Sequence, residues 1–140
     1  MASKKGLDFE SFSLEKDADA GIDVVMVDPR SDEEFEGIDG KPIVITVRGM
    51  DSDIWTKRID RIAKRNAEKY KKRNVPTSVV RGNFIEAVAS VVMGWSKNIP
   101  WQGEVLEFTP DNALKLLGMS NGFSDQLLSE ITNRANLKKN

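Results

Sequence analysis

Closely spaced carboxylates are the part of this chain that comes nearest to a reactive or metal-binding site. Asp17, Asp19 and Asp23 lie two and four residues apart beside Gly21, a spacing similar to that of a calcium-binding loop. Such a loop requires a bidentate glutamate at its twelfth position, where this sequence has Asp28, and it requires a preceding helix, for which the sequence shows no pattern. We therefore expect no metal site.

Nucleophilic and redox chemistry has little support, because the sequence contains no cysteine and no histidine. Disulfides, zinc sites built on thiolates or imidazoles, cysteine nucleophiles and dyads with a histidine base are excluded. The Gly37–Gly40 segment lacks the lysine and the following helix of a phosphate-binding loop. The sequence therefore predicts a protein that is not an enzyme and that has no cofactor.

Length and composition indicate a single domain over residues 1–140. The chain has 39% hydrophobic and 31% charged residues, as ordinary globular proteins do. Its longest apolar-rich run, 84–95, contains Glu86 and is far shorter than the roughly 20 residues that span a membrane. We do not expect the N-terminal residues to form a secretory signal, because acidic residues follow them in place of an apolar segment. We expect a cytoplasmic protein.

Charge is distributed unevenly, although the formal net charge is only −1. Residues 1–56 carry a net charge of −8, residues 57–73 carry +7, and residues 74–140 are neutral overall. The basic segment is interpreted as a solvated helix face partly neutralised by the acidic block, as a docking face for an acidic protein, or as a nucleic-acid site. The last is disfavoured, because the segment lacks interleaved aromatic residues and a nucleic-acid-binding motif.

The first third of the chain predicts a loose tail followed by a β element. Residues 1–22 are read as the tail, or at most as one edge strand, and residues 23–49 as the β element. Within it, the β-branched run 24–27 and the alternating apolar residues of 43–47 indicate two strands that pair antiparallel. The acidic connection 30–41 suits a long exposed hairpin loop.

Residues 50–137 predict about four packed helices, which makes the fold class α+β: an N-terminal β-hairpin or small antiparallel sheet followed by helices. The first helix is capped by Asp51 or Ser52 and ends near Arg73, ahead of the Val75-Pro76 pair. Its apolar residues recur at steps of three and four and predict one inner stripe: Trp55, Ile59, Ile62, Ala63, Ala67 and Tyr70.

The second helix is predicted over 84–95, because Asn83 and Glu86 have the spacing of a capping box ahead of a segment that is apolar nearly all round. Periodicity alone also allows a buried strand here because of the valines, but the length and the cap favour a helix. We expect this helix at the centre of the core. After it, Gln102-Gly103 predicts a turn.

The two remaining helices have start signals of their own. Thr109 is a good N-cap with Pro110 in the first helical position, and Gly118 predicts a left-handed end to that helix. Ser124 is predicted to cap the last helix, with Phe123 and Leu128 as a hydrophobic staple. Its inner face would consist of Leu127, Leu128, Ile131 and Ala135.

The last third of the chain resembles the C-terminal part of the tail assembly chaperones of tailed bacteriophages. The resemblance is carried by Gly94-Trp95, Trp101 with Gly103, Phe108-Thr109-Pro110-Asp111, Leu114, Leu116-Leu117 and Ile131-Thr132-Asn133-Arg134. It implies a small, non-enzymatic protein of the host cytoplasm, with no catalytic residue, that keeps the tape measure protein soluble and assists polymerisation of the tail tube protein. These two proteins are the partners that the resemblance implies.

A holding chaperone needs apolar surface for its client and charge elsewhere to stay in solution. We expect Trp101, Phe123 and Leu127 to supply the apolar contact, and Lys64 and Arg65 to steer acidic client segments. Trp101 also fits a packing position in the core, as tryptophans commonly do. Two alternative functions stay open, a structural tail component retained in the virion and a small nucleic-acid-binding regulator that uses residues 57–73.

Overall fold

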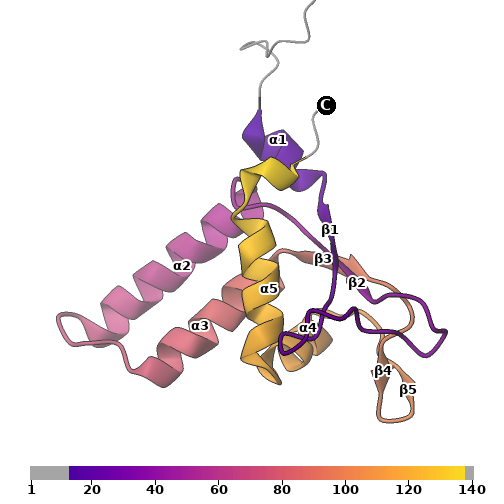
Figure 1. Cartoon of the computed structure of the whole chain (residues 1–140). Coiled ribbons are helices and arrows are strands. Elements are labelled where there is room, and N and C mark those ends of the chain that lie inside the picture. The colour runs from indigo at the N-terminus through magenta and orange to yellow at the C-terminus, as the bar shows by residue number, and fades with distance from the viewer. Residues whose placement is uncertain (1–12, 138–140) are drawn as a thin grey trace, which may run out of the picture.

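The computed structural model describes residues 13–137 and combines a small antiparallel sheet with a group of packed helices (Figure 1). The helices are α1 (Leu14–Asp19), α2 (Asp53–Tyr70), α3 (Thr77–Ser90), α4 (Pro110–Gly118) and α5 (Asn121–Ile131), followed by a 3₁₀ helix (Arg134–Asn136). The strands are β1 (Ile22–Val25), β2 (Val44–Val47), β3 (Val92–Trp95), β4 (Pro100–Trp101) and β5 (Glu104–Val105). The predicted α+β class is confirmed.

The predicted antiparallel pair is present, and its alternation defines the inner face of the sheet. β1 pairs with β2, with Ile22 opposite Val47 and Val24 opposite Ile45. These four side chains are buried, whereas Asp23 on the other face is exposed. Each such aliphatic side chain contributes roughly 1.5–3 kcal/mol when it is buried, so the pattern fixes the register.

The connection between β1 and β2 is exposed, as predicted, but it is ordered by specific contacts. We call residues 30–41 the acidic loop. Two isolated β-bridges, Val27 with Glu34 and Glu36 with Pro42, shape it. The buried side chain of Asn98 holds its end, where Nδ2 donates to Asp39 Oδ1 at 2.9 Å and to the carbonyl oxygen of Lys41 at 3.1 Å.

The predicted helix over residues 84–95 is wrong at both ends. α3 begins at Thr77 and ends at Ser90, and Val92–Trp95 forms β3, the third strand of the sheet in the order β1-β2-β3. The valines 91 and 92 favour extended structure, and pairing of Trp95 with Ile45 across the sheet stabilises it. The sheet is therefore completed after two helices and is not confined to the N-terminal part.

The tail expected over residues 1–22 is also corrected, as far as the described residues reach. Residues 1–12 lie outside them, but Ser13 caps α1 with its hydroxyl, Ala18 is fully buried and Ile22 begins β1. α1 is fastened to the middle of the chain, because Gly49 N donates to the carbonyl oxygen of Ala18 at 3.1 Å. These residues belong to the folded domain.

α2 begins as predicted, with Ser52 as its N-cap, but its apolar stripe is only partly covered. Ile62 is buried and Trp55 packs against the core, whereas Ile59 and Ala63 are exposed. The reason is that α2 packs mainly on α3 and projects with it from the rest of the molecule (Figure 1). One helix neighbour covers a narrower stripe than a complete core would.

The predicted start of α4 is confirmed, whereas the predicted start of α5 is wrong. Thr109 caps α4, and its hydroxyl accepts from Asn112 N at 3.0 Å. Gly118 is not in the left-handed region, and α4 ends with Met119 in the right-handed one. α5 is capped by Ser120 and not by Ser124, which is buried one turn inside the helix. Ala135 lies in the 3₁₀ helix and is exposed, outside the inner face of α5.

Candidate partner-binding site

An apolar pocket of about 170 Å³ opens between the sheet, the β4–β5 ribbon and the first turn of α5. All of its lining side chains are apolar: Met26, Phe35, Ile43, Ile45, Ile99, Pro100, Trp101, Leu116, Met119 and Phe123. Sites for drug-sized ligands measure roughly 300–1,000 Å³, so this pocket is matched to a single large side chain. Because none of the described residues that line it is charged, the pocket suits an apolar group.

The α5 wall of the pocket is fixed by contacts with the chain that follows β1. Gln126 clamps the backbone of Val27, donating from Nε2 to its carbonyl oxygen at 2.6 Å and accepting from its N at 3.0 Å. The rings of Phe35 and Phe123 meet edge to face, with centroids 5.7 Å apart. At Gly122 a Cβ would lie 2.7 Å from Pro29 Cγ, so this close approach requires glycine.

The rim of the pocket is formed by the β4–β5 ribbon and by the end of α4. Gln102 and Gly103 both have positive φ, 52° and 83°, as the two central residues of a type I′ hairpin turn do. The predicted Gln102-Gly103 turn is thus confirmed, and it places the half-buried Trp101 at the rim. Met119 stands at the opening with 60% of its surface exposed.

Trp95 has a packing role that distinguishes it from Trp101. Its indole Nε1 donates to the carbonyl oxygen of Leu106 at 2.9 Å, and its ring meets that of Phe108 edge to face at 5.1 Å. These contacts fasten β3 to the segment between β5 and α4. Trp95 thereby supports the ribbon that carries Trp101.

The structure brings together two of the five residues predicted to bind a partner. Trp101 and Phe123 both line the pocket. Leu127 is fully buried in the core, so it offers no surface to a partner and that expectation is corrected. Lys64 and Arg65 lie on α2, none of whose residues lines the pocket.

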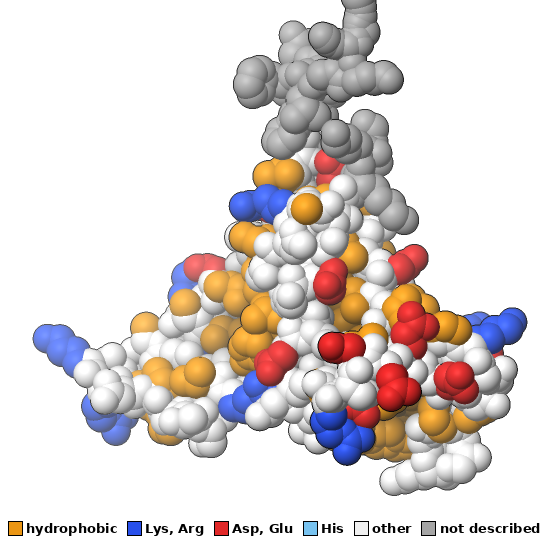
Figure 2. Space-filling view, viewed as in Figure 1, with side chains coloured by type: hydrophobic (Ala, Val, Ile, Leu, Met, Phe, Trp, Pro, Cys, Tyr) orange, Lys and Arg blue, Asp and Glu red, His pale blue; other side chains and the backbone are white. Residues whose placement is uncertain are grey.

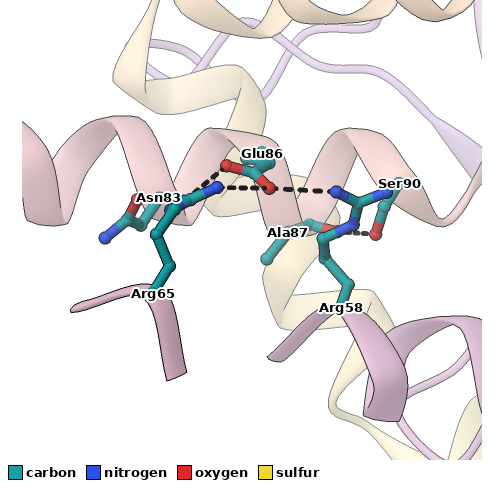
Figure 3. Close-up of polar contacts among 6 residues, drawn as sticks. All are labelled: Arg58, Arg65, Asn83, Glu86, Ala87 and Ser90. Atoms are coloured by element: carbon teal, nitrogen blue, oxygen red, sulfur yellow. Dashed lines mark hydrogen bonds and ion pairs between the residues drawn. The ribbon is translucent and has the colours of Figure 1, made fainter. Parts of the chain in front are cut away.

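Arg65 takes part in an intramolecular network that joins α2 to α3 (Figure 3). Its Nη2 donates to Glu86 Oε1 at 2.8 Å and to Asn83 Oδ1 at 2.8 Å, and Arg58 Nη1 reaches Glu86 Oε2 at 3.0 Å. The hydrogen bonds from Arg65, and secondarily from Arg58, hold the pKa of Glu86 below its ordinary value despite partial burial. Asn83 and Glu86, which the sequence suggested as a capping box, therefore connect two helices instead.

Lys64 is exposed and pairs with Asp60 one turn earlier in α2, with 3.1 Å between Nζ and Oδ2. Lys57 pairs with Asp53 in the same way, at 2.8 Å. Among the described residues, Asp53 is the single carboxylate of the acidic block that forms an ion pair with the basic segment. No carboxylate of the acidic loop, residues 30–41, forms an ion pair with α2.

Sequence reasoning missed most of the pocket, because its lining comes from several separated parts of the chain. Met26 and Ile43 flank the acidic loop, Phe35 lies within it, and Met119 follows α4. Phe35 is the residue with a usable signal, since it is a large aromatic in the middle of an acidic run. Nothing in the sequence indicates that Phe35 approaches Phe123.

The carboxylates considered for calcium do not form a loop. Asp17 and Asp19 lie in α1, and Asp23 lies in β1. Within residues 13–137, no group of three or more Cys, His, Asp or Glu is placed to hold a metal ion. No helix in that same range is both long enough and apolar enough to cross a bilayer.

Comparison with protein-family models, with curated protein sequences and with solved structures finds no match. The resemblance to tail assembly chaperones therefore stays a prediction from the sequence. The apolar pocket and the charged surfaces carry the functional interpretation.

Proposed function

We propose that this protein is a tail assembly chaperone of a tailed bacteriophage, acting in the host cytoplasm, and that it holds an apolar part of the tape measure protein through the pocket. The observation that supports this proposal is the pocket itself, which has an entirely apolar lining and an opening beside the exposed Met119. A pocket that fits one side chain suits the transient grip of a client by an anchor residue. The tail tube protein is the second expected partner.

The resembling residues support the same surface. Trp101 and Leu116 belong to the resemblance and both line the pocket. Gly103 forms the turn that positions Trp101, and Thr109 with Pro110 starts the helix that carries Leu116. The segment that resembles the family is thus also the segment that builds one wall and the rim of the pocket.

Two point variants of the α4 region test the role of the pocket. Met119→Lys places a charge at the opening, whereas Leu114→Lys changes a residue that is also exposed, at 44%, but does not line the pocket. Because a charge at the opening must be desolvated when an apolar side chain enters, client binding should fall at least tenfold in the first variant. The second should bind as the unchanged protein does.

The measurement is the soluble yield of the tape measure protein from the same phage, co-expressed with each variant. A client that is equally soluble with and without this chain would rule out the chaperone function. Mass spectrometry of purified virions separates the structural alternative, since a retained tail component would be found there in many copies and an assembly factor would not.

A further inference from the structure

The α2–α3 arm, residues 53–90, presents an unpartnered surface that is both apolar and basic. Ile59, Ala63 and Ala67 are exposed and recur every four residues along one flank of α2. Ile59 is 42% exposed, and Val80 on the neighbouring helix is 52% exposed. Such side chains on a projecting helix pair lack the cover that a complete core would give them.

Many basic side chains of the arm also have no carboxylate partner among residues 13–137. Four of the nine basic side chains in residues 57–73 pair with carboxylates. Lys69 lies over the ring of Tyr70 at 5.5 Å, and Arg73 Nη2 donates to the carbonyl oxygen of Lys69 at 3.0 Å at the end of the helix. Lys71 and Lys72, which follow the apolar flank at the end of α2, are exposed and form no ion pair with any described residue.

The acidic loop carries the charge opposite to that of the arm, and it also has an exposed apolar side chain. Figure 2 shows acidic side chains over the half of the molecule that carries the β1–β2 connection, and basic ones over the tip of the arm. The carboxylates of the acidic loop are those of Asp32, Glu33, Glu34, Glu36 and Asp39. Between the last two lies Ile38, a large apolar side chain that is 62% exposed.

The tip of the acidic loop is held in one shape before any contact forms. Ile38 N donates to the carbonyl oxygen of Asn98 at 3.0 Å, and the Asn98 side chain bonds Asp39 at 2.9 Å. At Gly37 a Cβ would collide with the Asn98 side chain, so the approach requires glycine. Because the loop is already ordered, little conformational entropy is lost when Ile38 docks.

We propose that the acidic loop of one molecule docks on the α2–α3 arm of a second copy of this chain. Ile38 lies against the apolar flank at Ala67, and the carboxylates beside it face Lys71 and Lys72, which follow the flank at the end of α2. The two surfaces are different and lie on different parts of the molecule, so the contact is heterologous and each copy keeps one free loop and one free arm. Association is therefore open-ended and rises with concentration.

A second copy fits the arm better than a nucleic acid does. A phosphate backbone would answer the basic side chains but leave the apolar flank exposed, whereas the loop supplies both carboxylates and an apolar side chain. The acidic side chains elsewhere on the protein also repel phosphate. Because pairs between exposed charges are weak and screened by salt, the contact should be transient and salt-sensitive.

Charge reversal on each surface, followed by mixing, tests the contact. The loop-reversed variant carries Glu34→Lys with Glu36→Lys, and the arm-reversed variant carries Lys71→Glu with Lys72→Glu. All four side chains are exposed and none forms an ion pair with a described residue, so the fold should be kept. Controls with the same change in net charge elsewhere are Glu104→Lys with Glu107→Lys, and Lys97→Glu with Lys115→Glu.

The readout is molar mass by sedimentation from about 10 μM to about 1 mM protein, at about 0.05 M and about 0.5 M salt. The unchanged protein and both controls should associate at low salt and dissociate at high salt. Each reversed variant alone should associate at least tenfold more weakly. An equimolar mixture of the two should associate again, because a basic loop then meets an acidic arm.

Three results would overturn the proposal. The first is a monomer at every concentration in low salt, and the second is association that neither reversal weakens. The third is salt-dependent binding of a DNA duplex to the arm without self-association, which would identify nucleic acid as the occupant. Failure of this contact leaves the pocket and its client assay unaffected, since none of the four reversed residues lines the pocket.

Discussion

At the scale of single residues, the pair of Asp51 and Arg134 joins distant parts of the chain most directly. Arg134 Nε donates to Asp51 Oδ2 at 2.6 Å and its Nη2 donates to Oδ1 at 2.7 Å, a bidentate arrangement. The hydrogen bonds from Arg134 hold the pKa of Asp51 below its ordinary value, although partial burial opposes them. The carboxylate sits immediately before the cap of α2, and the guanidinium sits in the 3₁₀ helix.

Replacing Asp51 with Asn should lower the free energy of unfolding by about 1 kcal/mol at neutral pH, since the guanidinium is half-exposed and the pair is partly screened. Because the pKa of Asp51 is lowered in the folded state, this contribution is fully present above the unfolded value near 3.8 and is lost as the pH falls through the lower folded value. Urea unfolding at several pH values measures it.

The matched control is Glu104→Gln, an exposed carboxylate with no ion pair among the described residues. It should leave both the stability at neutral pH and its acid dependence unchanged. An Asp51→Asn variant with the same acid dependence as the unchanged protein would show that the pair contributes nothing.

Local signals explain which residues the sequence placed correctly. Ser52 and Thr109 cap helices as predicted, because a cap depends on its own side chain and on backbone groups a few residues away. Ser120 and Ser124 offered the same local chemistry, and packing decided between them: the hydroxyl of Ser124 is buried and accepts from Arg81 Nη2 at 2.9 Å. That partner is remote in sequence, so no local pattern reveals it.

At the scale of elements, β3 shows where sequence reasoning ended. A run of residues that is apolar all round is compatible with a buried helix or a buried strand. Residues up to Ser90 became helix and Val92–Trp95 became strand, because β2 offered an edge for pairing. The pocket was hard to predict for a similar reason: the local patterns suggested Trp101 and Phe123, whereas its other walls depend on how the elements meet.

The acidic loop gives a prediction at this scale, because one side chain of another segment orders it. Asn98→Ala removes donors to Asp39 Oδ1 and to the carbonyl oxygens of Lys41 and Pro42. Leaving these groups unpaired should cost about 1–3 kcal/mol of stability. Cleavage within residues 30–41 during limited proteolysis should become faster. Mass spectrometry of the fragments identifies the sites that are cut.

The neighbouring exposed lysine provides the control, since Lys97→Ala changes the same turn without touching the loop. It should be cleaved at the rate of the unchanged protein. Equal cleavage of the Asn98 variant and this control would show that the loop is ordered by its own two bridges and not by Asn98.

At the scale of the whole molecule, α2 differs from the rest of the fold in how much packing protects it. The sheet packs with α3, α4 and α5 around one cluster of buried residues, whereas α2 contributes to that cluster mainly at its N-terminal end, through Trp55. Elements with few buried contacts open locally more often than the core does. α2 should therefore be a less protected part of the fold than the sheet and α5.

Amide hydrogen exchange measures this difference. Amides of residues 63–70 in α2 should exchange at least tenfold faster than those of β2 and of residues 124–131 in α5, because the latter are buried on the sheet. If self-association covers the arm, protection of residues 63–70 should rise with protein concentration. Uniform protection of α2 and β2 at low concentration would contradict the expected difference.

The bonds at Gly49 and Met50 have a consequence for how the molecule forms during synthesis. Gly49 N donates to the carbonyl oxygen of Ala18, and Met50 N donates to that of Ile131 at 3.0 Å. Residues 49 and 50 therefore join α1 to the end of α5. A nascent chain that has not yet emerged through Ile131 lacks the second of these two hydrogen bonds. The bond that joins residue 50 to the end of α5 therefore forms only after α5 has been synthesised.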